Sequence, residues 1–126
     1  MKNILVVDDN IIGRRLATVI LRDHEFTVTE ASSGEEALAK MRAARFDCIL
    51  MDISMPGLSG TDVVQMVRAD PALAGLHVVG YTAHAMSEDI KRILACGFDD
   101  ILIKPISGDK IVAAMSKRGG PAAAAD

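Results

Sequence analysis

The chain has 126 residues, the size of one average domain, which argues against a two-domain organisation. Half of the residues are hydrophobic, a quarter are charged, and 14 basic against 17 acidic side chains give a net charge of −3. A sizeable core can therefore form, and the acidic balance disfavours direct binding to a nucleic-acid backbone.

Short apolar runs alternate with helical patterns, which is typical of βαβ units on a parallel sheet. The first strand is predicted at residues 4–7. The helix after it, which Asp9 or Asn10 can cap, has apolar residues on one face at Ile12, Leu16, Val19 and Ile20.

A second strand is predicted at residues 26–29, where polar and apolar residues alternate. Ser33 and Glu36 then form the pattern of a capping box, and the inner face of that helix is predicted at Ala37, Leu38 and Met41. The third strand, residues 48–51, is apolar without alternation, so we expect helices on both of its faces and a place in the middle of the sheet.

The second half of the chain predicts two more strands and three more helices. The strands are expected at residues 77–81 and 101–103. The helices are expected around Val63, Val64, Met66 and Val67, from a cap at Ser87 to a stop at Gly97, and from Ser107 to the break at residues 119–121. The fold class is thus α/β, with five parallel strands and five helices.

Polar side chains follow four of the predicted strands. Parallel sheets bind ligands outside the carboxyl ends of their strands, at a switch point of the topology. If the strand order is 2-1-3-4-5, the following side chains converge on one edge: Asp8, Asp9, Asp52, Thr82 and Lys104. Each alone could be a cap, a turn residue or a solvated charge, but the joint placement at strand ends indicates a functional site.

Three carboxylates that close together would raise one another's pKa unless a cation lies among them. Mg²⁺ suits hard oxygen ligands and leaves room for a phosphoryl oxygen. Asp52 can then act as a nucleophile on phosphorus while Lys104 and the metal neutralise the phosphoryl oxygens.

From Lys2 to about Lys117 the sequence resembles the receiver domain of two-component response regulators, which has a flavodoxin-like, doubly wound sheet of order 2-1-3-4-5. The resemblance is carried by residues 6–10 (VVDDN), residues 50–57 (LMDISMPG), Gly60, Thr82-Ala83 and Lys104-Pro105. It implies that Asp52 accepts a phosphoryl group from a phosphohistidine of a histidine kinase or a histidine phosphotransfer protein.

The resemblance also implies roles for the neighbours of Asp52. Asp8, Asp9 and the main-chain carbonyl of Ser54 would help to hold Mg²⁺. Lys104 would pair with the phosphoryl oxygens, Thr82 would swing its hydroxyl toward them, and the Lys104-Pro105 peptide bond would be cis, as it often is in the family.

One position departs from the family pattern. Many receivers carry Tyr or Phe three residues before the lysine, and here the position is Ile101. We therefore expect the signal to travel through the loop after Thr82 and the fourth helix rather than through a ring flip. The alternative is a receiver that uses its surface around the fourth and fifth helices with little switching. Ser54 and His84 hold the positions that flank the attacking water in dephosphorylation and should tune the lifetime of the phosphorylated state.

Other classes fit less well. A haloacid dehalogenase phosphatase needs a second Asp two residues after the nucleophile, where this chain has Ser54. A nucleotide-binding flavodoxin-like module needs a glycine-rich phosphate loop, and the first turn is acidic instead. A receiver-like interaction module that is never phosphorylated is the remaining alternative, and the complete acidic set speaks against it.

The sequence thus predicts one receiver domain at residues 1–118 and a disordered tail at residues 119–126. We expect a phosphoacceptor rather than an enzyme, either a single-domain regulator of the chemotaxis type or the receiver of a hybrid kinase. Its output protein would bind the face formed by the fourth helix, fifth strand and fifth helix, and no direct contact with nucleic acid or membrane is expected.

The remaining cysteines and histidines predict no further site. Cys48 lies in an apolar run and reads as a buried side chain, and neither it nor Cys96 belongs to a disulfide framework, which favours a reducing cytoplasm. No apolar run reaches the roughly 20 residues that span a bilayer, and no secretory signal is present. His24 and His77 are expected at the surface.

Overall fold

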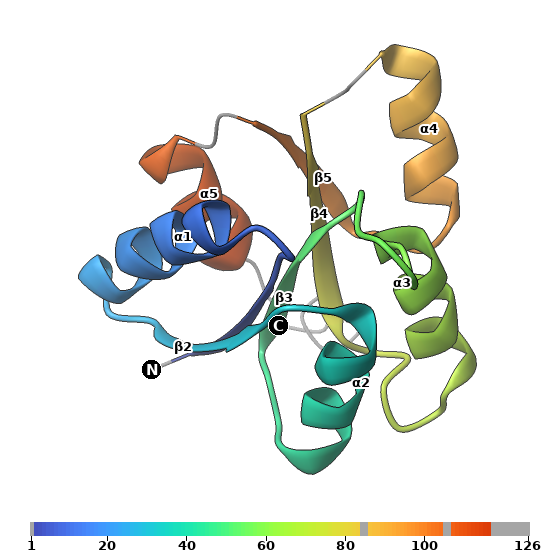
Figure 1. Ribbon diagram of the computed structural model, residues 1–126, viewed down its shortest axis with the longest axis horizontal. Coiled ribbons are helices and arrows are strands. Elements are labelled where there is room, and N and C mark those ends of the chain that lie inside the picture. Colours follow the sequence, from blue (N-terminus) through green and yellow to red (C-terminus); the bar gives the residue numbers. More distant parts are fainter. Residues whose placement is uncertain (1, 84–85, 105–106, 117–126) are drawn as a thin grey trace.

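The computed structural model describes residues 2–83, 86–104 and 107–116, in which five strands alternate with five helices (Figure 1). In chain order these are β1 (Asn3–Val7), α1 (Ile11–Asp23), β2 (Thr27–Ala31), α2 (Gly34–Ala43), β3 (Cys48–Asp52), α3 (Gly60–Ala69), β4 (His77–Thr82), α4 (Ser87–Ala95), β5 (Asp100–Ile103) and α5 (Gly108–Ser116). The strands form one parallel sheet in the order β2-β1-β3-β4-β5, which confirms the predicted fold class.

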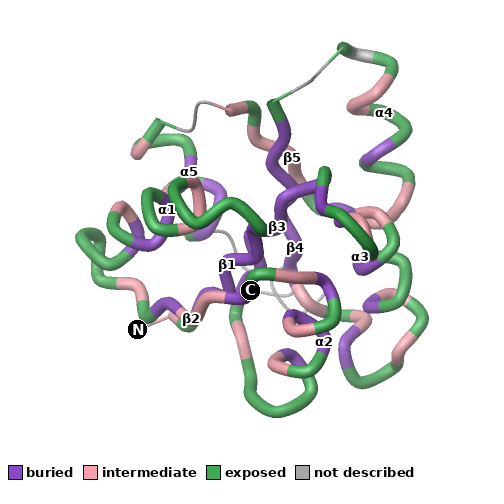
Figure 2. The backbone as a smooth tube through the Cα atoms, in the orientation of Figure 1, coloured by how far each residue is buried: buried purple, intermediate pink, exposed green. Residues whose placement is uncertain are grey.

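Helices cover both faces of the sheet (Figure 1). On one face, side chains such as Ile4, Leu50 and Val79 pack with α1 and α5. On the other, side chains such as Leu5 and Ile49 pack with α2, α3 and α4. Every residue of β3 is buried, as Figure 2 shows, so the prediction of a central strand covered on both sides is confirmed.

The predicted apolar face of α1 is only partly the face that packs on the sheet: Ile20 packs against the core, but the other three residues do not. Ile12, Leu16 and Val19 are 77%, 53% and 65% exposed. The helix instead buries Ala17, Thr18 and Leu21 against the sheet and α5. The helix therefore leaves an apolar stripe of Ile12, Leu16 and Val19 in solvent.

The helix starts and stops largely follow the predicted signals. Asn10 caps α1 by accepting hydrogen bonds from the N–H groups of Ile12 and Gly13. The Ser33 hydroxyl accepts from the N–H of Glu36 at the start of α2, although Glu36 bonds back to Ser32 and not to Ser33, so only half of the expected capping box forms. Gly97 follows the end of α4 as expected.

Two local predictions are wrong. The cap of α4 is not Ser87 but Met86, which makes no side-chain capping bond, because the helix already includes Ser87. His77 is buried rather than exposed, since it opens the interior strand β4 and stands beside Cys48 of β3. Its Nδ1 atom lies 3.6 Å from Asp99, and its Nε2 atom is buried without a hydrogen-bond partner. His24 is exposed as predicted.

Within the described part of the chain, no helix is both long and apolar enough to cross a membrane. Cys48 and Cys96 are free, and burial raises the pKa of the Cys48 thiol to about 12, which keeps that thiol protonated. The predicted tail at residues 119–126 and the expected end of α5 at residues 119–121 lie outside the described residues.

Candidate functional site

The predicted site residues lie at the carboxyl edge of the sheet. Asp8 follows β1 directly, Asp52 is the last residue of β3, Thr82 is the last residue of β4, and Lys104 follows β5. Parallel strands end at the same edge, so the fold itself brings together residues that are far apart in the sequence.

Three carboxylates meet at this edge. Asp8, Asp9 and Asp52 each offer an oxygen, and the three oxygens lie within 4.8 Å of one another. Asp8 and Asp52 are buried, whereas Asp9 faces solvent. The ammonium of Lys104 lies 3.7 Å from Oδ2 of Asp8 and 3.6 Å from Oδ2 of Asp52. Four of the five side chains expected to converge, Asp8, Asp9, Asp52 and Lys104, are therefore brought together.

The charges of this pocket do not balance. The pKa of Asp52 is raised to about 6. Burial is the largest cause, the neighbouring Asp8 acts in the same direction, and Lys104 opposes the change. With all groups ionised, three carboxylates and one ammonium leave an excess of two negative charges. A divalent cation with oxygen ligands, such as Mg²⁺, fits both this charge and the donor set.

The loop after β3 holds Asp52 in place. The N–H of Ser54 donates to Oδ1 of Asp52 at 3.1 Å, and the N–H of Gly60 donates to the carbonyl of Ile53 at 3.0 Å. A Cβ atom on Gly60 would lie 2.5 Å from the carbonyl oxygen of Asp52. Only glycine therefore lets the start of α3 approach the end of β3 this closely.

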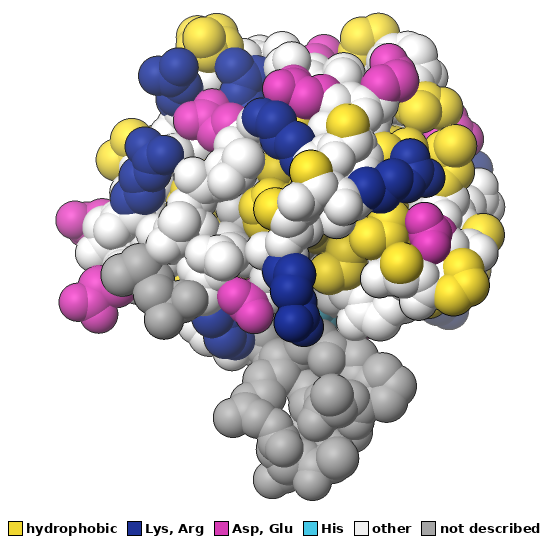
Figure 3. All heavy atoms as spheres, turned by 90° about the horizontal axis from the view of Figure 1, so that it is seen from below, with side chains coloured by type: hydrophobic (Ala, Val, Ile, Leu, Met, Phe, Trp, Pro, Cys, Tyr) yellow, Lys and Arg dark blue, Asp and Glu magenta, His cyan; other side chains and the backbone are white. Residues whose placement is uncertain are grey.

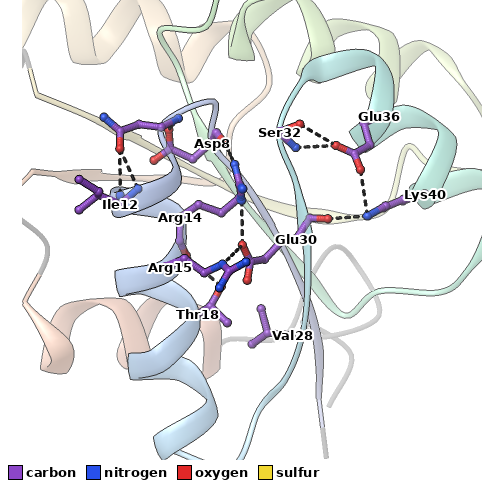
Figure 4. Close-up of polar contacts among 12 residues, drawn as sticks. Asp8, Ile12, Arg14, Arg15, Thr18, Val28, Glu30, Ser32, Glu36 and Lys40 are labelled. Atoms are coloured by element: carbon purple, nitrogen blue, oxygen red, sulfur yellow. Dashed lines mark hydrogen bonds and ion pairs between the residues drawn. The ribbon is translucent and has the colours of Figure 1, made fainter.

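Arg14 of α1 holds the turn after β1 that carries Asp8 and Asp9 (Figure 4). One guanidinium nitrogen donates to the main-chain carbonyl of Asp8 at 2.9 Å, and Nε donates to Glu30 of β2 at 2.7 Å. Glu30 in turn lies 3.3 Å from Arg15, and its main-chain carbonyl accepts a hydrogen bond from Lys40. The network ties the ends of β1 and β2 to α1 and α2 and fixes the main chain that carries Asp8.

Thr82 lies on the face of the sheet that α3 and α4 cover. It is buried and lines a cavity of about 360 Å³ together with Ser54, Asp89 and Arg92, between the loop after β3 and α4. Ile101 is half-buried and packs into the apolar cluster beneath α3 and α4. The position thus holds an inward aliphatic side chain.

Tyr81 and Gly13 lie next to the carboxylates, and neither was predicted from the sequence as a residue of the site. The hydroxyl of Tyr81 donates to Oδ2 of Asp8 at 2.5 Å, and the ammonium of Lys104 lies 4.5 Å from the centre of the Tyr81 ring. A Cβ atom on Gly13 would lie 2.8 Å from the same Asp8 oxygen. A glycine inside a helical pattern is a signal of close packing that could have pointed to this contact.

Two expectations concern residues outside the described part of the chain. His84 was expected to flank an attacking water, and the Lys104-Pro105 peptide bond was expected to be cis. Neither His84 nor Pro105 is described, so both remain predictions.

Proteins similar to this chain share its fold and its family. The receiver domain of a Pseudomonas aeruginosa sensor histidine kinase, whose structure is described with a magnesium ion coordinated in the active-site cleft, is 27% identical with a TM-score of 0.85 over 93% of this chain and 96% of that one. The chemotaxis protein CheY4 of Vibrio cholerae is 30% identical with a TM-score of 0.87 over 94% of this chain and 98% of that one.

The curated relatives are longer proteins. Hybrid signal transduction histidine kinase I of Dictyostelium discoideum is 37% identical in an alignment of 113 residues, which covers 84% of this chain and 6% of that protein. In general the chain spans about half the length, or less, of the curated relatives it matches. The family model described as the response regulator receiver domain matches residues 4–116, and this chain belongs to that family.

Proposed function

We propose that the chain is a phosphoacceptor of a two-component phosphorelay and that Asp52 takes the phosphoryl group. The observation that carries the proposal is the buried carboxylate of Asp52 between two further carboxylates and the ammonium of Lys104. In the transfer, an Asp52 oxygen forms the new P–O bond while the P–N bond to the donor histidine breaks and its electron pair returns to the imidazole.

Asp8, Asp9, Asp52 and the main-chain carbonyl of Ser54 would hold Mg²⁺. When bound, the metal neutralises charge on the transferred phosphoryl group. Phosphoryl transfer needs mainly positioning and charge compensation, which Lys104 supplies from the protein side. Thr82, at the end of β4, would move its hydroxyl toward the phosphoryl group, and Ser54 and His84 would set how long the acyl phosphate survives.

The apolar stripe of α1 supports a docking surface for the phosphohistidine donor. Ile12 and Leu16 of the stripe also line a cavity of about 300 Å³ that reaches Lys104, so the stripe is continuous with the mouth of the site. A donor protein that covers the stripe would bring its phosphohistidine to Asp52 and exclude water. Replacing Ile12 and Leu16 by Ser should slow transfer from a phosphohistidine protein while phosphorylation by a small donor continues.

The output protein would bind the face formed by α4, β5 and α5. Leu94 of α4 and Ile103 of β5 are exposed, and among the residues of α4 whose burial is described only Ile93 is buried. A helix with so few buried contacts can shift at little cost, which suits an element that reports phosphorylation. On the face drawn in Figure 3, hydrophobic side chains lie among charges of both signs, which fits a protein partner better than nucleic acid.

Phosphorylation by phosphoramidate, a small donor with a P–N bond, tests the proposal. We expect the mass of the protein to rise by one phosphoryl group when Mg²⁺ is present, and Asp52→Asn to abolish the rise. Asp47→Asn, which removes an exposed carboxylate elsewhere, is the matched control. Repeated release of phosphate from a phosphate ester would instead show a phosphatase. No incorporation, with partner binding unaffected by Asp52→Asn, would show a phosphorylation-independent interaction module.

A phosphoacceptor of this kind is not an enzyme of multiple turnover. Its acceptor carboxylate is part of the chain and stays blocked until the acyl phosphate hydrolyses. Its two free cysteines, one of them buried, fit the reducing cytoplasm.

A further inference from the structure

Tyr81 is placed where two of the functional side chains meet. It is fully buried, on the face of the sheet that packs with α1 and α5, and its register partner on β3 is Asp52. Its hydroxyl donates to Asp8 and its ring lies under the ammonium of Lys104. A single side chain thus contacts both a carboxylate and the cation of the site.

The Asp8 carboxylate is held at both oxygens. Oδ1 accepts the N–H of Asn10 at 2.9 Å, and Oδ2 accepts the hydroxyl of Tyr81 at 2.5 Å. Gly13 leaves the space that Oδ2 occupies. Because Asp8 is completely buried, these contacts and not solvent decide the orientation of the carboxylate.

The ring of Tyr81 acts on the cation. The Lys104 ammonium lies 4.5 Å from the ring centre, a distance at which the face of an aromatic ring attracts a cation. From that position the same ammonium reaches Asp8 and Asp52 at 3.7 Å and 3.6 Å. The ring therefore favours the placement of Lys104 between the two carboxylates.

We infer that Tyr81 is a positioning residue of the phosphorylation site, whose hydroxyl orients Asp8 for Mg²⁺ and whose ring keeps Lys104 beside Asp52. The inference rests on the proposed function. The competing interpretation is a core tyrosine whose hydroxyl merely needs a partner.

Two substitutions separate the hydroxyl from the ring. Tyr81→Phe removes the donor and keeps the ring, and partners that orient metal ligands typically contribute about tenfold or more to metal affinity, so we expect Mg²⁺ to bind about tenfold more weakly. Phosphorylation by phosphoramidate should then be slow at limiting Mg²⁺ and recover as Mg²⁺ is raised. Tyr81→Leu also removes the ring, and its rate should stay about tenfold low even at saturating Mg²⁺.

Val79→Ala is the matched control. Val79 is buried two residues earlier on the same strand and the same face, so this variant loosens the same cluster without touching the carboxylates. Mg²⁺ affinity by titration calorimetry and the rate at each Mg²⁺ concentration should both stay within about twofold of the wild type, since the partners that orient the metal ligands remain.

The chain offers a second measurement that needs no Tyr81 variant. Tyr81 is the only tyrosine and there is no tryptophan, so the ultraviolet emission of the protein reports on this one hydroxyl. Binding of Mg²⁺ to the wild type should change the emission, and Asp8→Asn should change it without metal.

The outcomes distinguish the two proposals. A wild type that binds no Mg²⁺ and takes up no phosphoryl group overturns the proposed function and this inference together. A wild type that does both, with Tyr81→Phe matching its Mg²⁺ affinity or with an emission that ignores Mg²⁺, overturns the inference alone. A Tyr81→Phe effect no larger than that of Val79→Ala would assign Tyr81 to the core.

Discussion

Replacing Asp52 by Asn measures the strain that the acidic pocket imposes on the fold without metal. The pKa of Asp52 is raised from 3.8 to about 6, mainly by burial and then by Asp8, so its ionised form is less favourable in the folded protein than in the unfolded chain. At about 1.4 kcal/mol per pKa unit the upper limit of this cost is about 3 kcal/mol. Because the neighbouring groups titrate together with Asp52, we expect Asp52→Asn to raise the free energy of unfolding by about 1–3 kcal/mol at neutral pH in chelator.

The pH dependence of this difference has a defined sign. A group whose folded pKa is raised binds its proton more tightly in the folded state, so the wild type loses stability from Asp52 as the pH rises from about 4 through about 6. The neutral side chain of Asn does not titrate. The advantage of Asp52→Asn should therefore be small in acid, grow over this range and level off above it.

Urea unfolding followed by circular dichroism, with chelator, at weakly acidic and at neutral pH, provides the measurement. Asp23→Asn, an exposed carboxylate at the far end of α1, is the control and should change stability by less than about 0.5 kcal/mol. Added Mg²⁺ should stabilise the wild type by mass action and narrow the gap to Asp52→Asn. An Asp52→Asn protein that is less stable than the wild type in chelator would refute the reasoning.

Three further substitutions test two residues next to the carboxylates and one residue of the scaffold. Lys104→Met removes the cation from the pocket and should slow phosphorylation by phosphoramidate about a hundredfold, as followed by intact mass; an unchanged rate would contradict this role. Gly13→Ala places a methyl group 2.8 Å from Oδ2 of Asp8, so Mg²⁺ affinity by calorimetry should fall about tenfold, and equal affinity would argue against the crowding. Arg68→Met removes four hydrogen bonds to loop carbonyls and Asp99 and should cost about 2 kcal/mol in urea unfolding, with phosphorylation of the folded protein retained.

The sequence predicted the fold and the carboxylate cluster well because both follow from short-range patterns. Apolar runs mark the strands, and the alternation with helices requires parallel strands. Once the strands are parallel, a polar residue at a strand end must lie at the shared edge, which brings Asp8, Asp52 and Lys104 together without any knowledge of the loops.

Helix periodicity was less informative about what a face contacts. The spacing of Ile12, Leu16 and Val19 shows that α1 has an apolar face, but an apolar face can cover the helix's own sheet or remain for a partner. The choice depends on the residues opposite, and Ala17 with Leu21 fills the space above the sheet. The burial of His77 was not predicted for a similar reason. It follows from the position of β4 inside the sheet and from Asp99, which lies in a loop far along the chain.

The end of β4 shows why the strand-end rule found only part of the site. Successive side chains of a strand point to opposite faces, so Thr82 and Tyr81 serve different sides of the sheet. Thr82 lines the cavity next to α4, the helix expected to report phosphorylation, whereas Tyr81 contacts Asp8 and Lys104. An aromatic residue one position before a strand end reads as core, and only the register that pairs it with Asp52 reveals its place beside the carboxylates. If Tyr81 positions the site as inferred, phosphorylation and its readout depend on adjacent residues of one strand, and a change at Tyr81 should alter metal binding without directly altering the face that Thr82 and α4 share.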